Sequence, residues 1–201
     1  MPEAVSGGSP ASGKAQWHDE PMSIPSGSHD LGPSNGELRL GTTSEGKMAR
    51  MGHHLTLLVQ DWSGVLVTGD QPEDSSLRVT AQLGSLKVLS GQGGATPLTE
   101  DGKTKIINNA LGIMGASTHP ELSFTSTAIA GSWDEGKVEG TLTLNGRSEM
   151  QQFDVARDSD GRYRLTGTIT QSRYGIKPYS AMMGALLLGD DVSVEVVLSI
   201  D

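Results

Sequence analysis

Apolar and polar residues alternate through most of the chain, in short segments separated by turns rich in glycine, aspartate and asparagine. Leu55, Leu57 and Val59, for example, are spaced two apart, which places their side chains on one face of a β-strand. Eight segments show this period of two: residues 36–42, 54–69, 75–91, 122–131, 136–146, 152–158, 162–172 and 192–200. Their spacing predicts antiparallel neighbours closed into a β-sandwich or β-barrel.

One stretch in the middle of the chain has helical periodicity instead. Its apolar residues recur at intervals of three and four, at Ile106, Ile107, Ala110, Leu111 and Met114. Thr99 is suited to cap the first turn, and Gly112 or Gly115 to end the helix. We therefore expect one short helix inserted between the strands.

The first 36 residues differ in composition from the rest. Eighteen of them are Gly, Pro or Ser, and apolar periodicity is absent. Such a segment buries too little apolar surface to offset its ordering entropy. We predict a disordered tail over residues 1–36 and one folded domain over residues 37–201, with a partner motif around Trp17 and His18 as the alternative reading of the tail. The first residues lack the basic and apolar regions of a secretory signal.

Charge and composition exclude several classes of protein. The net charge of −9 argues against a nucleic-acid binder and predicts no basic patch for anionic lipid head groups. The absence of cysteine excludes disulfides and thiolate chemistry, and no apolar run reaches the length of a membrane-spanning helix. We therefore expect a soluble, cytoplasmic protein. Because only 4% of its residues are aromatic, we expect its core to be aliphatic.

No motif predicts catalysis or a metal site. Gly102–Thr104 reads GKT, but a phosphate-binding loop needs a glycine where Pro97 stands. His53 and His54 are adjacent on a predicted strand, so their side chains point to opposite faces and cannot easily share a metal. A serine nucleophile elbow is missing, and most carboxylates lie in turns. We expect no catalytic residue, no metal and no enzymatic activity.

The segment AMMGALLLG, residues 181–189, interrupts the alternation just before the last strand. Because it joins two strands, it must lie at one end of the barrel. One interpretation is a plug that closes the core. The other is a gate, in which the flexible Met182 and Met183 line the mouth of an apolar cavity. Both interpretations remain open from the residues alone.

Several stretches together resemble the YceI-like family of polyisoprenoid-binding, lipocalin-like proteins, in the form common in actinobacteria. The matching stretches, in order, are GHHLTLLVQDWSG at 52–64, HPELSFTST at 119–127, VEGTLTLNG at 138–146 and LTGTITQSRYGIKPYSAMMGALLLGDDVSVEV at 165–196. The resemblance implies an antiparallel eight-stranded barrel with a helical insertion, an apolar tunnel for a long-chain isoprenoid, no catalytic residues and a tendency to dimerise.

Residues and resemblance together predict an all-β, eight-stranded lipocalin-like barrel that binds, stores or transports an isoprenoid, a quinone or a similar amphiphilic lipid. No cofactor is expected beyond such a lipid. His53 and Tyr179 are the candidate contacts for a polar head group. The predicted ligand-binding residues are His53, Leu57, Val59, Trp62, Phe124, Leu142, Phe153, Ile169, Ile176, Tyr179, Met182, Met183 and Leu187.

Two alternative functions remain open. One is a stress-related interaction protein with a filled barrel that acts through its loops or tail. The other is an enzyme on quinones or lipids, which would require a redox cofactor.

Overall fold

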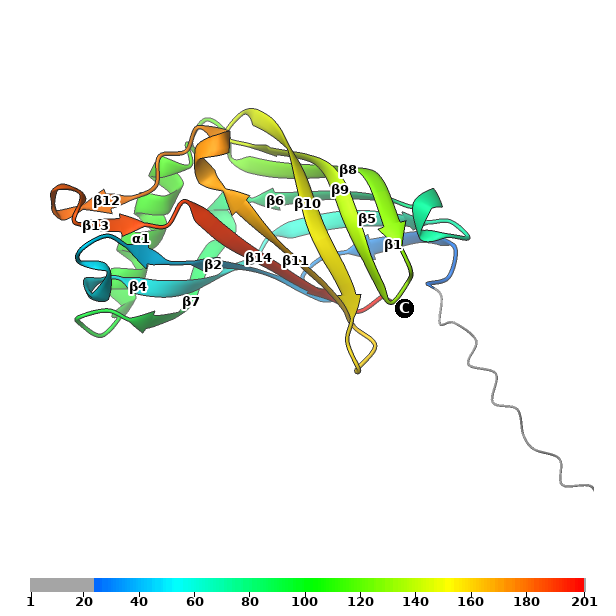
Figure 1. Ribbon diagram of the computed structural model, residues 1–201, viewed down its shortest axis with the longest axis horizontal. Helices are drawn as coiled ribbons and strands as arrows, with labels where there is room; N and C mark the ends of the chain where they lie inside the picture. Colours follow the sequence, from blue (N-terminus) through cyan, green and yellow to red (C-terminus); the bar gives the residue numbers. More distant parts are fainter. Residues whose placement is uncertain (1–23, 201) are drawn as a thin grey trace, which may run out of the picture.

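The computed structural model describes residues 24–200, and its largest feature is an antiparallel sheet of eleven strands (Figure 1). The strands follow one another across the sheet in the order β1-β5-β6-β8-β9-β10-β11-β14-β2-β4-β7. The sheet curls around an apolar interior into a half-barrel. Its strands are β1 Gly27–Leu31, β2 Gly36–Thr42, β4 His53–Val59, β5 Trp62–Thr68, β6 Ser76–Gln82, β7 Leu86–Gly93, β8 Glu121–Gly131, β9 Glu135–Leu144, β10 Arg147–Arg157, β11 Tyr163–Thr170 and β14 Asp191–Leu198.

The predicted count of eight strands is wrong, because two of the eight segments bend and each forms two strands. Residues 54–69 divide into β4 and β5 at Gln60–Asp61, and residues 75–91 divide into β6 and β7 at the 3₁₀ turn Leu83–Ser85. Backbone hydrogen bonds join the two bends: Gln60 N donates to Ser85 O over 3.2 Å, and Gln82 N donates to Asp61 O over 2.9 Å. Alternation alone does not detect such a bend, because both halves keep a period of two.

The eleventh strand, β1, lies inside the predicted tail, so the predicted boundary at residue 36 is also wrong. β1 pairs with β5 along its whole length, from Gly27 opposite Thr68 to Leu31 opposite Gly64. Leu31 is buried, and the side chain of His29 lies 3.0 Å from the Thr68 hydroxyl. Backbone pairing with β5 supplies the order that composition did not predict. The rest of the predicted tail, residues 1–23, lies outside the described residues.

The inward positions mostly follow the predicted alternation. Leu38, Leu55, Leu57 and Val59 are all buried in the core. Beyond the bend the phase shifts, so that Trp62 points inward while Val65 and Val67 are about 40% exposed.

Helix α1, Glu100–Ile113, is the predicted helical insertion. The Thr99 hydroxyl caps it by accepting a hydrogen bond from Gly102 N over 3.1 Å. A hydrogen bond from Lys103 lowers the pKa of Glu100 in the first turn. At the other end, Gly115 adopts a left-handed φ of 65°, as glycine does after a helix. No residue of α1 is fully buried, so the helix lies over one end of the half-barrel as a cover.

A second, three-stranded sheet stands beside α1 at the same end (Figure 1). It consists of β3 Ser44–Glu45, β12 Ser180–Ala181 and β13 Leu186–Leu188, in the order β12-β13-β3. The segment proposed as plug or gate is therefore a hairpin, with the 3₁₀ turn Met182–Gly184 at its tip. The remaining 3₁₀ turns are Ala49–Met51, Pro72–Asp74 and Gln171–Tyr174.

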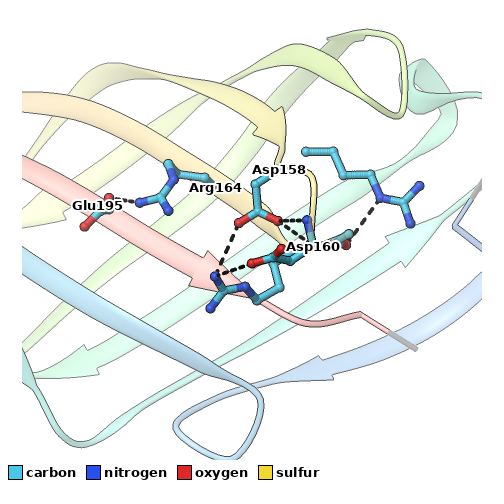
Figure 2. A network of polar contacts seen from close by, with 7 residues as sticks. Asp158, Asp160, Arg164 and Glu195 are labelled. Atoms are coloured by element: carbon cyan, nitrogen blue, oxygen red, sulfur yellow. Dashed lines mark hydrogen bonds and ion pairs between the residues drawn. The ribbon is translucent and has the colours of Figure 1, made fainter.

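The outer face near the β10–β11 turn carries a network of ion pairs (Figure 2). Arg162 lies 3.5 Å from a carboxylate oxygen of Asp158 and 3.4 Å from one of Asp160, and Arg164 pairs with Glu195 of β14. Because these side chains are largely solvated, each pair contributes at most about 1 kcal/mol to stability. They hold the hairpin against β14 and lie far from α1 (Figure 1).

Candidate ligand-binding cavity

A cavity of about 310 Å³ lies between α1 and the half-barrel. Strands β2 and β4 form one wall, α1 forms the opposite wall, and β13 closes the side. The lining residues are Leu40, Thr42, Ser44, Met51, Gly52, His53, Leu55, Leu57, Leu86, Lys105, Ile106, Asn109, Ala110, Ile113, Met114, Gln171, Tyr179, Leu186, Leu187, Leu188 and Val192. Most of these side chains are apolar, so the cavity suits an apolar molecule.

The helical wall follows from the periodicity of α1. Ile106, Ala110 and Ile113 recur at intervals of four and three and line the cavity, whereas Ile107 and Leu111 pack against the core. Ala110 is the smallest of the lining residues of α1. Its short side chain therefore leaves free volume in the centre of the helical wall.

The wall formed by the sheet follows from alternation. Leu40 on β2 pairs directly with Leu57 on β4, and both line the cavity. Thr42 on β2 pairs with Leu55 on β4 in the same way and also lines it. Neighbouring strands thus present one continuous, mostly aliphatic surface to the helix.

A few polar groups lie among these apolar residues. The Gln171 side-chain amide donates a hydrogen bond to Gly189 O over 3.0 Å, and the His53 ring lies 3.0 Å from Thr96 O. Thr42 is 8% exposed, and its hydroxyl is buried without a partner among the described residues. Lys105 and Asn109 lie on the exposed edge of α1. Thr42 is the lining residue with unused hydrogen-bonding capacity in the interior.

The thirteen predicted site residues fall into four groups. Four of them line the cavity: His53, Leu57, Tyr179 and Leu187. Two more are partly buried against the core, Phe153 and Ile169. Five are buried in the core and line no cavity: Val59, Trp62, Phe124, Leu142 and Ile176. The structure places all five in the buried core cluster and not on the wall of either cavity.

The last two predicted residues, Met182 and Met183, point away from the cavity. Met183 is fully exposed and Met182 is 51% exposed, because the β12–β13 turn projects beyond α1 (Figure 1). These two methionines therefore neither plug the core nor line the mouth of the cavity. The leucines that follow, Leu186, Leu187 and Leu188, do reach the cavity.

The helical wall was not predicted from the sequence. The helix and its apolar stripe were predicted, but no ligand contact was assigned to Ile106, Ala110, Ile113 or Met114. The apolar stripe of α1 is wide, so its residues can contact both the core and the cavity.

A second, smaller cavity of about 70 Å³ lies at the opposite end of the half-barrel. Tyr163 lines it, and desolvation by burial raises the pKa of this phenol. Between the two cavities, Phe124 and Phe153 meet edge to face with ring centroids 5.3 Å apart, beside Trp62 and Leu142. The interior therefore contains two cavities, which are separated by packed core residues.

Within residues 24–200, no three side chains of His, Asp or Glu are grouped closely enough to hold a metal ion. No helix there combines the length and the apolar character needed to cross a bilayer.

Comparison with known proteins identifies the family and the fold. The family model described as the YceI-like domain matches residues 38–200. The crystal structure of BcnA from Burkholderia cenocepacia is similar, with a TM-score of 0.61, 16% sequence identity and coverage of 81% of this chain and 94% of BcnA. A polyisoprenoid binding domain from Saccharophagus degradans, implicated in plant cell wall breakdown, has a TM-score of 0.51 and 14% identity, with coverage of 87% of this chain and 97% of that domain. No curated protein matches the sequence significantly.

Proposed function

The chain belongs to the family of YceI-like domains, and from this premise we propose that it binds an apolar or amphiphilic lipid, without catalysis, in the cavity under α1. An isoprenoid, a quinone or a similar amphiphile is the ligand class that we propose. The observation that carries the proposal is the cavity itself, about 310 Å³ with largely aliphatic walls. The polyisoprenoid binding domain with a similar fold supports the same class of ligand.

The apolar walls of the cavity also support a ligand. The cavity is partly open to solvent. An apolar ligand therefore gains about 25 cal/mol for each Å² of apolar wall that it removes from water.

The size and position of the cavity suggest how the ligand lies. A volume of about 310 Å³ is at the lower end of ligand pockets, which span about 300–1,000 Å³. Because Trp62, Phe124 and Leu142 fill the middle of the half-barrel, a long chain would place only one end between α1 and the sheet. We propose that this end is apolar, and that the Thr42 hydroxyl accommodates any polar group that follows it inside.

Native mass spectrometry of the freshly purified protein, followed by solvent extraction, tests the proposal. We expect a discrete adduct that extracts as an isoprenoid, a quinone or an acyl lipid, or uptake of geranylgeraniol after incubation. A bare polypeptide mass that persists after incubation with polyprenols, quinones and fatty amides would contradict it. A copurifying redox cofactor would instead favour an enzyme on quinones or lipids.

The packed middle of the half-barrel favours one other candidate, the filled-barrel interaction protein. Deleting residues 1–23 distinguishes the two, because this deletion leaves β1 in place. A lipid binder keeps its ligand after the deletion, whereas a protein that acts through its tail loses its partner. The cytoplasmic location and the homodimer stay predictions.

A further inference from the structure

Exposed methionines mark the end of the molecule at which the cavity lies. Met182 and Met183, here called the Met tip, occupy the β12–β13 turn with exposed fractions of 51% and 106%. Both have a left-handed backbone, with φ of 52° and 55°, which costs energy for residues other than glycine and asparagine. Met51 and Tyr179 line the cavity nearby and are themselves about 40% exposed. Four exposed apolar side chains therefore lie in the segments that form this end of the molecule, and two of them also line the cavity.

Two cations lie in the segment next to the Met tip. Strand β13 pairs with β3, and Met48 N donates a hydrogen bond to Ala185 O over 2.9 Å. These contacts hold residues 46–51 against the hairpin, and this segment carries the exposed side chains of Lys47 and Arg50. Lys177 precedes β12 of the same hairpin and is also exposed.

The charge of this end is opposite to that of the rest of the chain. Residues 44–54 and 176–188 together hold three cations and one carboxylate, Glu45, a net charge of +2. Because the whole chain has a net charge of −9, the rest carries −11. Among the described residues, no carboxylate lies within 4.0 Å of Lys47, Arg50 or Lys177, since the ion pairs are formed elsewhere. The overall charge predicted no basic patch, and the local excess of cations in these two segments departs from that expectation.

We propose that the Met tip, with Lys47, Arg50 and Lys177, docks the protein on an anionic lipid bilayer. The two methionines enter the interfacial region, and the three cations contact lipid phosphates and carboxylates. The −11 of the rest of the chain keeps the remaining surface away from the bilayer. This inference rests on the proposed function, because docking by this end turns the mouth of the cavity toward the membrane from which a lipid would be taken up.

A second copy of this chain is the other occupant that an exposed apolar surface could have. Packing two Met tips together would bring Lys47 and Arg50 of one copy close to those of the other, and like charges across an interface are unfavourable. Charge complementarity therefore favours the anionic bilayer.

Vesicle flotation with the full chain tests the docking. We expect the protein to float with vesicles of phosphatidylcholine and phosphatidylserine, to float much less with phosphatidylcholine alone, and to be released by high salt. The double variant Met182→Ser/Met183→Ser should weaken binding at least about tenfold, because each methionine contributes apolar burial. The double variant Lys47→Gln/Arg50→Gln should weaken it about 25-fold, at about fivefold for each cation.

Matched controls lie elsewhere on the half-barrel. Met150 on β10 is 53% exposed, like Met182, and Lys137 on β9 is an exposed lysine. Met150→Ser and Lys137→Gln should leave flotation unchanged. All substituted side chains are exposed, and thermal unfolding followed by circular dichroism verifies that each variant folds. Equal flotation of the Met-tip variant and the parent, or no flotation of the parent, would overturn the docking.

A transfer assay separates this inference from the proposed function. Geranylgeraniol is supplied either in ethanol or in the vesicles, and its uptake is measured by native mass spectrometry. We expect the Met-tip variant to bind the alcohol from ethanol as the parent does and to lose uptake from vesicles. A parent that floats but takes up the alcohol from neither source contradicts the proposed function and leaves docking supported. A Met-tip variant that floats normally but changes its mass in light scattering makes this end a self-association surface and overturns the docking.

Discussion

Filling the cavity from the helix should weaken ligand binding and stabilise the protein. Ala110 lies in the centre of the wall formed by α1, where a larger side chain would enter the cavity. The substitution Ala110→Phe adds one phenyl ring at this position. Because the ring replaces empty or hydrated space with protein, the ligand-free protein gains contacts that the ligand would otherwise make.

The expected magnitudes follow from the volume. A phenyl ring occupies roughly the volume of three water molecules, or about 90 Å³ at about 30 Å³ each. At about 24 cal/mol per Å³, which holds for a dry cavity, filling this volume raises the free energy of unfolding by at most about 2 kcal/mol. The ligand loses about three methylene positions, worth about 0.8 kcal/mol each, so its Kd rises roughly 50-fold.

Displacement of a fluorescent fatty probe by geranylgeraniol measures the affinity, and urea unfolding of the ligand-free protein measures the stability. Asn108→Phe is the matched control, because Asn108 is exposed on the same helix and does not line the cavity. It should change neither quantity by more than a small factor. An Ala110→Phe variant that folds and binds within twofold of the parent would show that the ligand does not lie under α1.

Three further substitutions test individual groups. Thr42→Val removes a buried hydroxyl without a partner, so urea unfolding should show a free energy of unfolding raised by about 1 kcal/mol. The variant should bind a ligand with a polar head group more weakly and a hydrocarbon equally well. Tyr174→Phe removes another buried hydroxyl without a partner. Burial raises the pKa of Tyr174, so the neutral phenol stabilises the folded protein below about pH 10, and this contribution is lost as the pH rises through the folded-state pKa. In alkaline unfolding measurements the variant should therefore lose less stability than the parent. Thr99→Ala should destabilise α1 by about 1 kcal/mol and increase hydrogen exchange of its amides, whereas Thr104→Ala, whose hydroxyl donates only to Glu100 O, should have a smaller effect.

Local periodicity predicted the type of most elements, but not the phase across interruptions. Leu55, Leu57 and Val59 alternate without a break and are all buried. In β8 a bulge between Ser126 and Ala128 shifts the register, so Ile129 turns inward although strict alternation from Phe124 would place it on the outer face. The strand count failed for the same reason, since a bend preserves a period of two on both sides. β1 was missed because its order comes from pairing with β5, which no local pattern encodes.

The candidate site was predicted only in part, because a cavity depends on elements that are distant in the sequence. Leu57, His53, Tyr179 and Leu187 were selected from strands and the last loop, and they do line the cavity. The wall opposite them is α1, whose position over β2 and β4 follows from tertiary packing alone. Trp62 and Phe124 were expected to line a tunnel because they alternate inward, but inward residues can equally fill a core.

Methionine methyl NMR tests the central claim, that an apolar ligand binds between α1 and the half-barrel, most directly. Met51 and Met114 line the cavity, whereas Met150 lies on the outer face of β10. Titration of the labelled protein with geranylgeraniol should shift the methyl resonances of Met51 and Met114 and give intermolecular contacts to the ligand, with Met150 unchanged. Saturable binding that leaves Met51 and Met114 unshifted would contradict the claim and place the ligand elsewhere.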